Sequence, residues 1–336
     1  MLQELTRQVR QNENLSELTA ERALRTILHD EVEDLDIKQF LIALSDKGEA
    51  VSEIVGFARE MKRSAVKVDS GMERLVDTAG TGGGMPTFNI STAAAFAIAG
   101  AGIPVAKHGN KAITSSAGSA DVLQELGVRL CRSPELAAVS LQEAGICFMF
   151  APFFHPAMAR VAGIRRELKR RTIFNMLGPL TNPAGARFQI IGVFSPGITE
   201  KMALALRQLG TGGAWVVHSR DGLDELSPLS SNRVSEVRDR RVQTFELHPE
   251  NLAGILPPGG TPGENASLIK QVLERTETGI ALEMVVLNAA AAIHLASGEN
   301  MVDSREIVRD SIRSGAALRK LEQLKELSNS GRFDED

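Results

Sequence analysis

From about residue 70 onward, short runs of apolar residues alternate with segments of helical periodicity, and this alternation limits the fold more than any other feature. The apolar runs are bounded by glycine or proline and stand in RLVDTAG, GIPVAKHG, ICFMFAP, FQIIGVF and AWVVHS. Helical patterns lie at 92–100, 120–126, 134–144 and 199–209. Strands that alternate with helices form a mostly parallel sheet with helices on both faces, and such strands are apolar throughout. We therefore predict an α/β fold with a mostly parallel central sheet flanked by helices.

The first 65 residues differ, because they carry helical periodicity and no strand signal. Apolar positions recur at helical spacing in ELTAERALRTIL, IKQFLIALSDKG and AVSEIVGFAREM. We predict a small all-α domain over residues 1–68. The stretch 155–185 is basic and helical in pattern, and we expect it to join this small domain. Residues 69–154 and 186–336 then form the large α/β domain.

Composition argues against several classes of function. The formal net charge is −4 and only 4% of the residues are aromatic, which argues against an extended nucleic-acid surface with stacking platforms. The longest small-apolar stretch, 93–106, is too short and glycine-rich to span a membrane, and the N-terminus has no signal-peptide pattern. Cys131 and Cys147 lack a metal-binding spacing and are expected to be buried thiols. We expect a cytoplasmic protein that binds neither nucleic acid nor membrane.

The stretch DTAGTGGGMPTFNISTAAA, residues 77–95, places four glycines within five positions after a predicted strand. A Walker A loop needs Lys and Ser or Thr directly after its last glycine, where this chain has Met85 and Pro86. A dinucleotide fingerprint needs glycine at the sixth position, which here is Met85. What remains is a strand, a glycine loop and a helix that opens at NIST, with Ser91 as the expected N-cap. Loop amides and a helix N-terminus favour an anion, and a turn that binds nothing is the alternative interpretation.

A second polar loop follows the next predicted strand. KHGNKAITSSAGSAD supplies lysine, histidine, asparagine and hydroxyl side chains from Lys107 to Ser119. Ligand sites of α/β proteins lie at the ends of strands. A solvated loop explains one such segment, but not two that each follow a strand. The two loops together indicate a phosphate site.

Five motifs in the right order then point to a family. GTGG with TFNISTAAAF, AKHGNKAITSSAGSADVL, HPAMARVAGIRREL, TIFNMLGPLTNP and DGLDELSP together resemble the anthranilate phosphoribosyltransferases, over about residues 10–325. The resemblance implies a small helical domain, a larger α/β domain and a site in the cleft between them. It implies a homodimer joined through the helical domain. It also implies Mg²⁺-dependent transfer of the phosphoribosyl group of phosphoribosyl pyrophosphate to anthranilate, giving N-(5-phosphoribosyl)anthranilate and pyrophosphate in tryptophan biosynthesis.

The resemblance also assigns site residues. Gly80, Asn110 and Arg165 match the residues that bind anthranilate. Ser91, Asp224 and Glu225 match the residues that bind Mg²⁺. The residues that match phosphoribosyl pyrophosphate contacts form a larger set: Gly80, Gly82, Gly83, Thr87, Asn89, Ile90, Ser91, Thr92, Lys107, His108, Gly109, Asn110, Lys111, Ser115 and Ser119.

Two departures from the family pattern matter. The family usually has Asp after GTGG, followed by Gly, whereas this chain continues with Gly84 and reaches Asn89 one residue sooner. Because that carboxylate is missing, we expect the Mg²⁺ dependence to change more than anthranilate binding. Lys111 stands where Arg is common, and it keeps the charge but not the fork geometry.

The implied chemistry requires placement rather than a strong base. Mg²⁺ with oxygen ligands neutralises the diphosphate leaving group, and a bidentate Arg165 suits the anthranilate carboxylate. Asp224 and Glu225 are adjacent, so on an extended loop they would diverge and serve separate ions; an acidic surface turn is the alternative interpretation. His108 is a candidate proton acceptor or positioning group, and we assign no residue a catalytic role. The remaining charges of the basic stretch are interpreted as solvated helix residues: Arg166, Lys169, Arg170 and Arg171.

Three other functions stay open from the sequence. A pyrimidine-nucleoside phosphorylase of the same fold has a similar Lys-His step, but it continues with Ser-Thr-Gly-Gly, whereas this chain continues with Gly109 and Asn110. A phosphoribosyltransferase with another acceptor is the second alternative, which the missing Asp keeps open. A non-catalytic nucleic-acid-binding module is the third, and the net charge of −4 and the acid pair argue against it.

Overall fold

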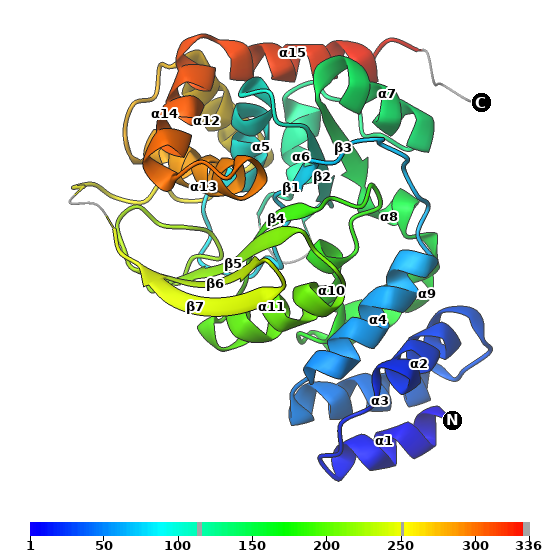
Figure 1. Ribbon diagram of the computed structural model, residues 1–336. Coiled ribbons are helices and arrows are strands. Elements are labelled where there is room, and N and C mark those ends of the chain that lie inside the picture. The colour runs from blue at the N-terminus through cyan, green and yellow to red at the C-terminus, as the bar shows by residue number, and fades with distance from the viewer. Residues whose placement is uncertain (113–115, 250–251, 332–336) are drawn as a thin grey trace.

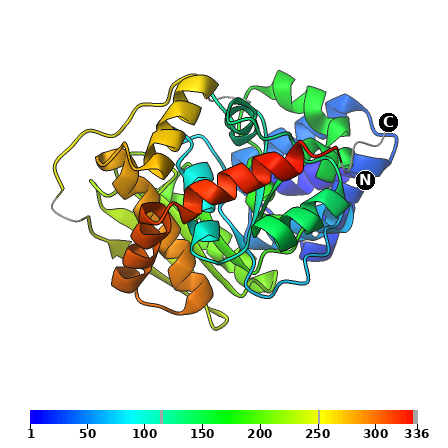
Figure 2. The same cartoon turned by 90° about the horizontal axis from the view of Figure 1, so that it is seen from above.

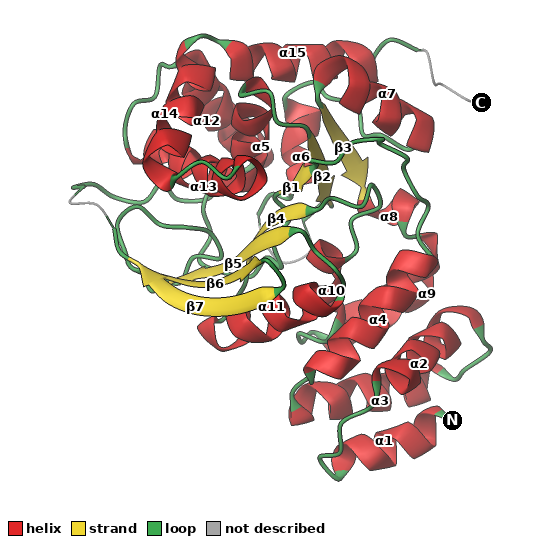
Figure 3. Ribbon diagram, in the orientation of Figure 1, coloured by secondary structure: helices red, strands yellow, loops and turns green. Residues whose placement is uncertain are grey.

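The computed structural model describes residues 1–112, 116–249 and 252–331. Figures 1 and 3 show a large body built around one sheet, with a bundle of N-terminal helices at one side of it. The bundle consists of α1 (Leu2–Arg10), α2 (Glu17–His29), α3 (Asp34–Lys47) and α4 (Val51–Arg63). Four helices and no strand therefore form the first 65 residues, as predicted.

The sheet has seven strands in the order β3-β2-β1-β4-β5-β6-β7. The strands are β1 (Val76–Asp77), β2 (Val105–Gly109), β3 (Ile146–Phe150), β4 (Phe188–Gly192), β5 (Gly213–Ser219), β6 (Asn232–Arg238) and β7 (Arg241–Leu247). The first five are parallel, and each lies in one of the five predicted apolar runs. The predicted α/β fold with a mostly parallel sheet is confirmed.

The antiparallel hairpin of β6 and β7 was not predicted from the sequence. Asp239 and Arg240 connect the two strands with φ values of 49° and 60°, which are left-handed conformations suited to a tight two-residue turn. Neither residue is glycine, so the usual hairpin signal is missing. β7 is also a partly exposed edge strand and lacks a continuous apolar run.

Successive side chains of the central strands enter two cores on opposite faces of the sheet. Ile190 and Trp215 belong to one core, whereas Ile191 and Val216 belong to the other. The first core is formed with α5 (Ile90–Gly100), α12 (Pro262–Glu274), α13 (Ile280–Ser297), α14 (Met301–Arg313) and α15 (Ala316–Ser328), of which α15, in red, crosses the middle of the view in Figure 2. The second core is formed with α4, α10 (Phe174–Leu180) and α11 (Thr199–Gln208). The remaining helices are α6 (Ser119–Glu125), α7 (Pro134–Ala144), α8 (Ala151–Phe154) and α9 (Ala159–Leu168), with 3₁₀ turns at Pro156–Met158 and Pro196–Ile198.

α10 lies between α4 and the sheet (Figure 1), and α9 packs against α2 and α3 of the bundle. Phe57 of α4 packs edge-on against Phe174 of α10, with ring centroids 6.4 Å apart. Arg160 of α9 donates a hydrogen bond to Asp34 of α3 at 2.8 Å. Apolar side chains of both helices share one buried core with the bundle. Residues 155–185 therefore connect the bundle to the face of the sheet that borders the second core.

α13 is the one helix among the described residues that is long and apolar enough to cross a membrane. It lies inside the first core, where 72% of its length is buried. A helix that is apolar on all sides is expected at the centre of a large protein. Burial in the core accounts for its composition.

The order of the strands reverses at β1. From β1 the chain continues to β2 and β3 on one side, and then returns to place β4 and β5 on the other side. Ligands of open α/β sheets bind at the carboxyl ends of the strands at such a reversal point. The loops that follow β1, β2, β4 and β5 leave the carboxyl ends of these strands and meet there. We call this end of the sheet its carboxyl edge.

Candidate active site

The glycine loop, residues 79–89, lies on the carboxyl end of β4 and on the loop after β5. The Thr81 N–H donates to Gly192 O at 2.8 Å, and the Met85 N–H donates to Gly222 O at 2.8 Å. A Cβ at Gly80 would lie 2.8 Å from Gly192 O, so a side chain there would separate the loop from β4. The loop is thus fixed by its backbone at the reversal point of the sheet.

Glycine is also required at the next three glycine positions. Gly82 and Gly83 have φ values of 67° and 92°, which residues with side chains rarely adopt. A Cβ at Gly84 would lie 2.4 Å from the Asp224 nitrogen and 2.5 Å from its Oδ1. The backbone of the loop therefore lies directly against one of the two predicted metal-binding acids.

α5 begins immediately after the glycine loop, at Ile90, with Asn89 in the N-cap position. The prediction that Ser91 caps a helix beginning at Thr92 is wrong. The helix begins two residues earlier, and the Ser91 hydroxyl accepts a hydrogen bond from Lys107 Nζ at 3.2 Å instead. Thr92 Oγ1 is buried and makes no hydrogen bond to the described residues. The first turn of α5 thus places hydroxyl groups at a helix N-terminus, a position that favours anions.

Lys107 is a buried cation near the carboxyl end of β2. Its Nζ donates to Thr78 Oγ1 and to Ser91 Oγ, each at 3.2 Å. Burial lowers the pKa of Lys107, while the carboxylates of Asp77 and Glu225 oppose that shift. An ammonium group that is buried beside α5 and the glycine loop can balance the charge of a bound phosphate.

Asp77 ends β1 and holds three segments of the site together. Its carboxylate accepts hydrogen bonds from the Ala79 N–H at 3.1 Å, the His108 N–H at 3.3 Å and Asn182 Nδ2 at 2.8 Å. Burial raises the pKa of Asp77, and the Lys107 charge opposes the rise. Neither Asp77 nor Asn182 was among the predicted site residues. The available signal was a carboxylate placed directly at the end of an apolar run.

Asp224 and Glu225 are half-buried in the loop that follows β5. Burial raises the pKa of Asp224, and hydrogen bonding to backbone groups, including Gly84, opposes the rise. Burial and the neighbouring Asp224 raise the pKa of Glu225 to about 8, although Lys107 and hydrogen bonds from Ser91 oppose the rise. Both of these adjacent, partly buried carboxyl groups ionise most readily when a cation lies beside them.

The donor set at this position fits Mg²⁺. Ser91, Asp224 and Glu225 supply one hydroxyl and two carboxylates, and Mg²⁺ binds oxygen ligands while it keeps several waters and substrate phosphates. The described residues contain no group of three or more His, Cys, Asp or Glu side chains that could hold a metal ion by themselves. A cation here would therefore share its coordination with phosphate oxygens and water.

The second polar loop follows β2. A Cβ at Gly109 would lie 2.2 Å from Ser119 Oγ, which brings the start of α6 against the end of the strand. Ser119 Oγ donates to Asn110 O at 3.5 Å, and Asn110 Oδ1 accepts the Lys111 N–H at 2.8 Å. The structure thus brings Gly109, Asn110 and Ser119 together and leaves Lys111 exposed. Ser115 lies outside the described residues.

Thr87 and Asn89 connect the glycine loop to distant parts of the chain. Thr87 pairs with Pro258 in an isolated bridge. Asn89 Oδ1 accepts a hydrogen bond from Asn265 Nδ2 at 3.0 Å, and Asn89 Nδ2 donates to Ala117 O at 3.3 Å. Asn89 therefore links the end of the glycine loop to the second polar loop, and the two loops were predicted to share one site.

His108 and His155 form a buried pair of imidazoles with ring centroids 5.0 Å apart. His108 Nδ1 lies 3.3 Å from Gly178 O, so it is the protonated nitrogen and Nε2 is left as an acceptor. Burial lowers the pKa of His108 to about 4 and that of His155 to about 3. Both Nε2 atoms are buried and make no hydrogen bond to the described residues. Two neutral rings therefore offer unused polar atoms.

α10 brings the histidine pair and Arg165 to one place. The Arg165 Cζ lies 5.6 Å from the centroid of the Phe174 ring, and His108 contacts the Gly178 carbonyl. Residues four apart lie on the same face of a helix. Burial lowers the pKa of Arg165, and no carboxylate of the described residues lies within ion-pair distance of its guanidinium. Arg165 thus has the environment of an anion-binding residue.

The rest of the basic stretch follows the prediction only in part: Arg166 is an exposed residue of α9, as predicted. Arg170 and Arg171 follow the end of α9 at Leu168, so they are not helix residues. Arg170 pairs with Asp46 at 2.6 Å. Arg171 donates to Gly83 O at 2.8 Å and its Cζ lies 4.3 Å from the centroid of Phe194. The interpretation of Arg171 as a solvated helix charge is wrong, because a tertiary contact places it on the glycine loop.

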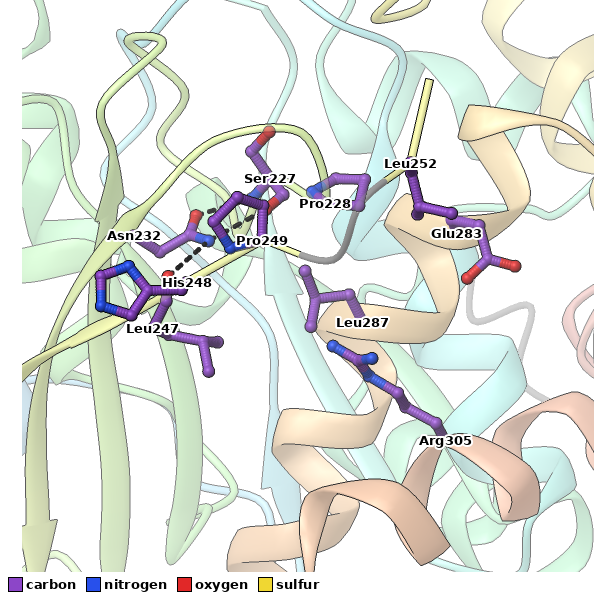
Figure 4. Close-up of a pocket in the computed structure, with 10 residues that line it drawn as sticks. All are labelled: Ser227, Pro228, Asn232, Leu247, His248, Pro249, Leu252, Glu283, Leu287 and Arg305. Carbon is purple, nitrogen blue, oxygen red and sulfur yellow. Dashed lines mark hydrogen bonds between the residues drawn. The ribbon is translucent and has the colours of Figure 1, made fainter. Parts of the chain in front are cut away.

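Two hollows lie apart from this site. A small cavity of about 10 Å³, which can hold about one water, separates the end of the β6–β7 hairpin from α13 and α14 (Figure 4). Its lining is Ser227, Pro228, Asn232, Leu247, His248, Pro249, Leu252, Glu283, Leu287 and Arg305. An open groove of about 440 Å³ lies at the amino ends of the strands, between Met72, Ile103 and Lys320. Neither lining includes a predicted site residue.

Known proteins match this chain over its full length. Residues 72–318 match the glycosyl transferase family α/β domain, and residues 3–65 match the helical bundle domain of that family. The anthranilate phosphoribosyltransferase of Desulfosudis oleivorans is 47% identical over 324 residues, or 94% of this chain and 96% of the relative. That of Rubrobacter xylanophilus is 47% identical over 98% of both chains.

Solved structures agree with the sequence relatives. The crystal structure of the anthranilate phosphoribosyltransferase of Thermus thermophilus has a TM-score of 0.89 and 39% identity, and the match covers 96% of this chain and 99% of that chain. The Saccharomyces cerevisiae enzyme, in complex with phosphoribosyl pyrophosphate and Mg, has a TM-score of 0.88 and 28% identity over 98% of both chains.

The fold and the site define an enzyme of the glycosyl transferase family that joins a helical bundle domain to an α/β domain. Within that family, the chain belongs to the anthranilate phosphoribosyltransferases, because relatives that cover nearly all of it share 47% of their residues with it. The family and the enzyme class expected from the five motifs are confirmed.

Proposed function

We propose that this chain transfers the phosphoribosyl group of phosphoribosyl pyrophosphate to the amino group of anthranilate, giving N-(5-phosphoribosyl)anthranilate and pyrophosphate, a step of tryptophan biosynthesis. Its family supports this reaction, and yeast relatives have been solved with phosphoribosyl pyrophosphate and Mg and with 4-fluoroanthranilate. The observation that carries the proposal for this chain is the meeting of two anion-binding groups at one edge of the sheet. Lys107 lies in β2 on the phosphate side, and Arg165 of α9, which lies over the Phe174 ring of α10, is on the acceptor side.

The phosphate side consists of the glycine loop, the first turn of α5 and the second polar loop. The positive-φ glycines expose backbone N–H groups, the α5 terminus adds its own, and Lys107 supplies a buried positive charge. The predicted contacts all belong to these three segments. They are Gly80, Gly82, Gly83, Thr87, Asn89, Ile90, Ser91, Thr92, Lys107, His108, Gly109, Asn110, Lys111, Ser115 and Ser119.

The acceptor side binds anthranilate through its two substituents. Arg165 has no carboxylate partner among the described residues, and a guanidinium binds a carboxylate with two parallel hydrogen bonds. The buried His108 Nε2 is an acceptor without a donor, which suits the aromatic amine of anthranilate. Gly80 and Asn110 complete the predicted acceptor contacts from the two polar loops.

Ser91, Asp224 and Glu225 would hold Mg²⁺ beside the diphosphate. When bound, the cation supplies positive charge to the oxygens of the leaving group. Gly84 keeps the loop backbone against Asp224, so the diphosphate and the acid pair share one wall of the site.

The residues act mainly by placement and by charge. The anthranilate nitrogen forms a bond to C1 while the C1–O bond breaks, and the electron pair of that bond leaves with the diphosphate. The nitrogen then loses one proton, for which the unprotonated His108 Nε2 is an available acceptor. Arg165 fixes the acceptor, and Lys107 balances the charge of the donor, so that both substrates react in one orientation.

The finer organisation of the molecule is also a proposal. We assign residues 1–68 with the helices at about 155–185 to the small domain, and residues 69–154 with 186–336 to the large one. We also propose a cytoplasmic location and a homodimer joined through the small domain. Large apolar side chains exposed on that domain support the dimer, among them Leu18 of α2 and Leu35 of α3.

The test is the loss of anthranilate fluorescence in the presence of phosphoribosyl pyrophosphate and Mg²⁺. We expect consumption that stops when the metal is chelated and that falls sharply in Asp224→Asn. Phosphorolysis of thymidine with no reaction of anthranilate would instead favour a pyrimidine-nucleoside phosphorylase. Turnover with a different aromatic or heterocyclic acceptor alone would favour the phosphoribosyltransferase with another substrate.

A further inference from the structure

We infer that Arg171 binds the diphosphate leaving group directly, as a positioning residue that reaches the glycine loop from the connection between α9 and α10. The inference rests on the proposed function and adds a residue that neither the motifs nor the family resemblance assigned. The first observation behind it is the contact between the Arg171 guanidinium and the glycine loop.

The Arg171 side chain is held from two sides. Its Nη2 donates to Gly83 O at 2.8 Å, and its Cζ lies 4.3 Å from the centroid of the Phe194 ring, which follows β4. A guanidinium stacked over an aromatic ring is attracted to the ring face. The Ser45 hydroxyl of α3 donates to Arg171 O at 3.1 Å, so the backbone of the arginine is fixed by the N-terminal bundle. The charged group is therefore preorganised at the loop.

Gly83 is shaped for this contact. Its φ of 92° favours glycine, its carbonyl accepts the hydrogen bond from Arg171, and a Cβ at this position would lie 2.6 Å from Arg171 Nη2. The absence of a side chain thus lets a cation touch the loop that borders the predicted diphosphate site.

Three other basic side chains of this region are already paired with carboxylates. Arg170 bonds Asp46, Arg160 bonds Asp34, and Lys38 bonds Glu167. No carboxylate of the described residues lies within ion-pair distance of Arg171, whose only recorded hydrogen-bond acceptor among them is Gly83 O. A guanidinium has five N–H donors, so most of them are available to a ligand.

The N–H donors of Arg171 that have no recorded acceptor suit the diphosphate leaving group. As the C1–O bond breaks, its electron pair moves to the diphosphate, whose negative charge is then greatest. An arginine binds phosphate oxygens through a planar fork, which a lysine does not reproduce. The next loop residue, Gly84, lies against the backbone and the carboxylate of Asp224, so Arg171 contacts the loop directly beside the acid pair. It thus borders both the diphosphate wall and the acid pair.

The experiment measures pyrophosphate binding by calorimetry, together with steady-state kinetics, in Arg171→Ala, Arg171→Lys and the matched control Arg170→Ala. In Arg171→Ala we expect the Kd of magnesium pyrophosphate and the KM of phosphoribosyl pyrophosphate to rise about tenfold to a hundredfold, as for the loss of a charged hydrogen bond. The KM of anthranilate should stay within about twofold of the wild type. Arg171→Lys should recover part of the loss, and added guanidinium should partly restore Arg171→Ala. Arg170→Ala should match the wild type.

Equal pyrophosphate affinity in Arg171→Ala and Arg170→Ala would overturn the inference. So would a loss of affinity for pyrophosphate and anthranilate alike without rescue by guanidinium, since that pattern indicates a structural latch on the loop. A wild-type chain that binds magnesium pyrophosphate but does not consume anthranilate would contradict the proposed function, while the comparison of the variants would still decide the role of Arg171.

Discussion

Three side chains on the acceptor side of the site owe their chemical state to burial. His108 and His155 stay neutral because their rings are buried together, and Arg165 is a half-buried cation whose recorded partner is the Phe174 ring. Polar atoms that are buried without partners are rare in folded proteins, and they gather where a ligand supplies the missing contact. A bound substrate is therefore expected to complete the contacts of these side chains.

Arg165→Ala should raise the KM of anthranilate about tenfold to a hundredfold, because the loss removes a charged bidentate contact to a carboxylate. The KM of phosphoribosyl pyrophosphate should change little. Steady-state kinetics with both substrates varied separately measures the split, and Arg165→Lys should recover only part of the loss. An unchanged KM of anthranilate in Arg165→Ala would remove this residue from the acceptor side.

The histidine pair should make the protein less stable in acid. Because the native pKa values of about 4 and about 3 lie below the unfolded value of about 6.5, the unfolded chain binds protons first as the pH falls. Their contribution is fully present above pH 6.5 and declines below it, by about 2 kcal/mol per histidine between pH 7 and pH 5. Urea unfolding of the wild type and of His108→Asn/His155→Asn at both pH values isolates this share. Parallel pH dependences in the two proteins would show that the rings are not held neutral.

Two elements define the geometry of the site, and they differ in how far they could be predicted from the sequence. The glycine loop could be predicted as part of the site, because its composition and its place after an apolar run are local properties. For α10, only its helical pattern could be predicted. Its role depends on tertiary contacts, since Phe174 lies under Arg165, Gly178 accepts from His108, and Gln189 of β4 donates to Pro179 O at 2.6 Å.

The same distinction explains the errors. Ser91 has the chemistry of an N-cap, but the lysine of a neighbouring strand takes its hydroxyl. Arg171 lies in a run of similar charges, and only the contact with Gly83 distinguishes it. The β6–β7 hairpin turns through Asp239 and Arg240 in place of glycine. In each case a contact distant in sequence, or a conformation unusual for its residue, overrode the local pattern.

At the element scale, Gly84→Ala should weaken metal binding. The added Cβ would lie 2.5 Å from Asp224 Oδ1, so either the loop or the acid must move. We expect the Mg²⁺ concentration for half-maximal activity to rise, with a smaller effect on the KM of anthranilate. Gly163→Ala in α9 is the matched control, because a Cβ there meets no atom within 4 Å. Identical Mg²⁺ titrations of the two variants would contradict the prediction, because they would show that the loop at Gly84 does not affect metal binding.

At the scale of the whole molecule, the chain order and the sheet order together place the site. The reversal of strand order at β1 brings the loops after β1 and β4 to one edge, and α9 and α10 bring the N-terminal bundle to that same edge. The parallel sheet was predictable, because buried strands read as apolar runs. The side-by-side order of those strands was not, since the runs themselves do not encode which strands pair.

The exposed apolar residues of the bundle lead to a prediction about assembly. Leu18 and Leu35 are 56% and 64% exposed, and burial in a dimer would remove them from water. Leu18→Glu/Leu35→Glu should sediment as a monomer under conditions where the wild type sediments as a dimer. Ile255→Glu is the control, because Ile255 is 87% exposed but belongs to the large α/β part of the chain. A dimer that survives the double substitution would place the interface elsewhere.

The central claim is that the donor substrate and its metal bind where the glycine loop meets the acid pair. A crystal structure with phosphoribosyl pyrophosphate, in which Mn²⁺ replaces Mg²⁺, tests it directly through the anomalous signal of the metal. The account predicts a metal peak beside Asp224 and Glu225, with the diphosphate along the backbone of residues 80–84. A metal and diphosphate bound away from this edge, such as in the groove between Met72 and Lys320, would contradict it.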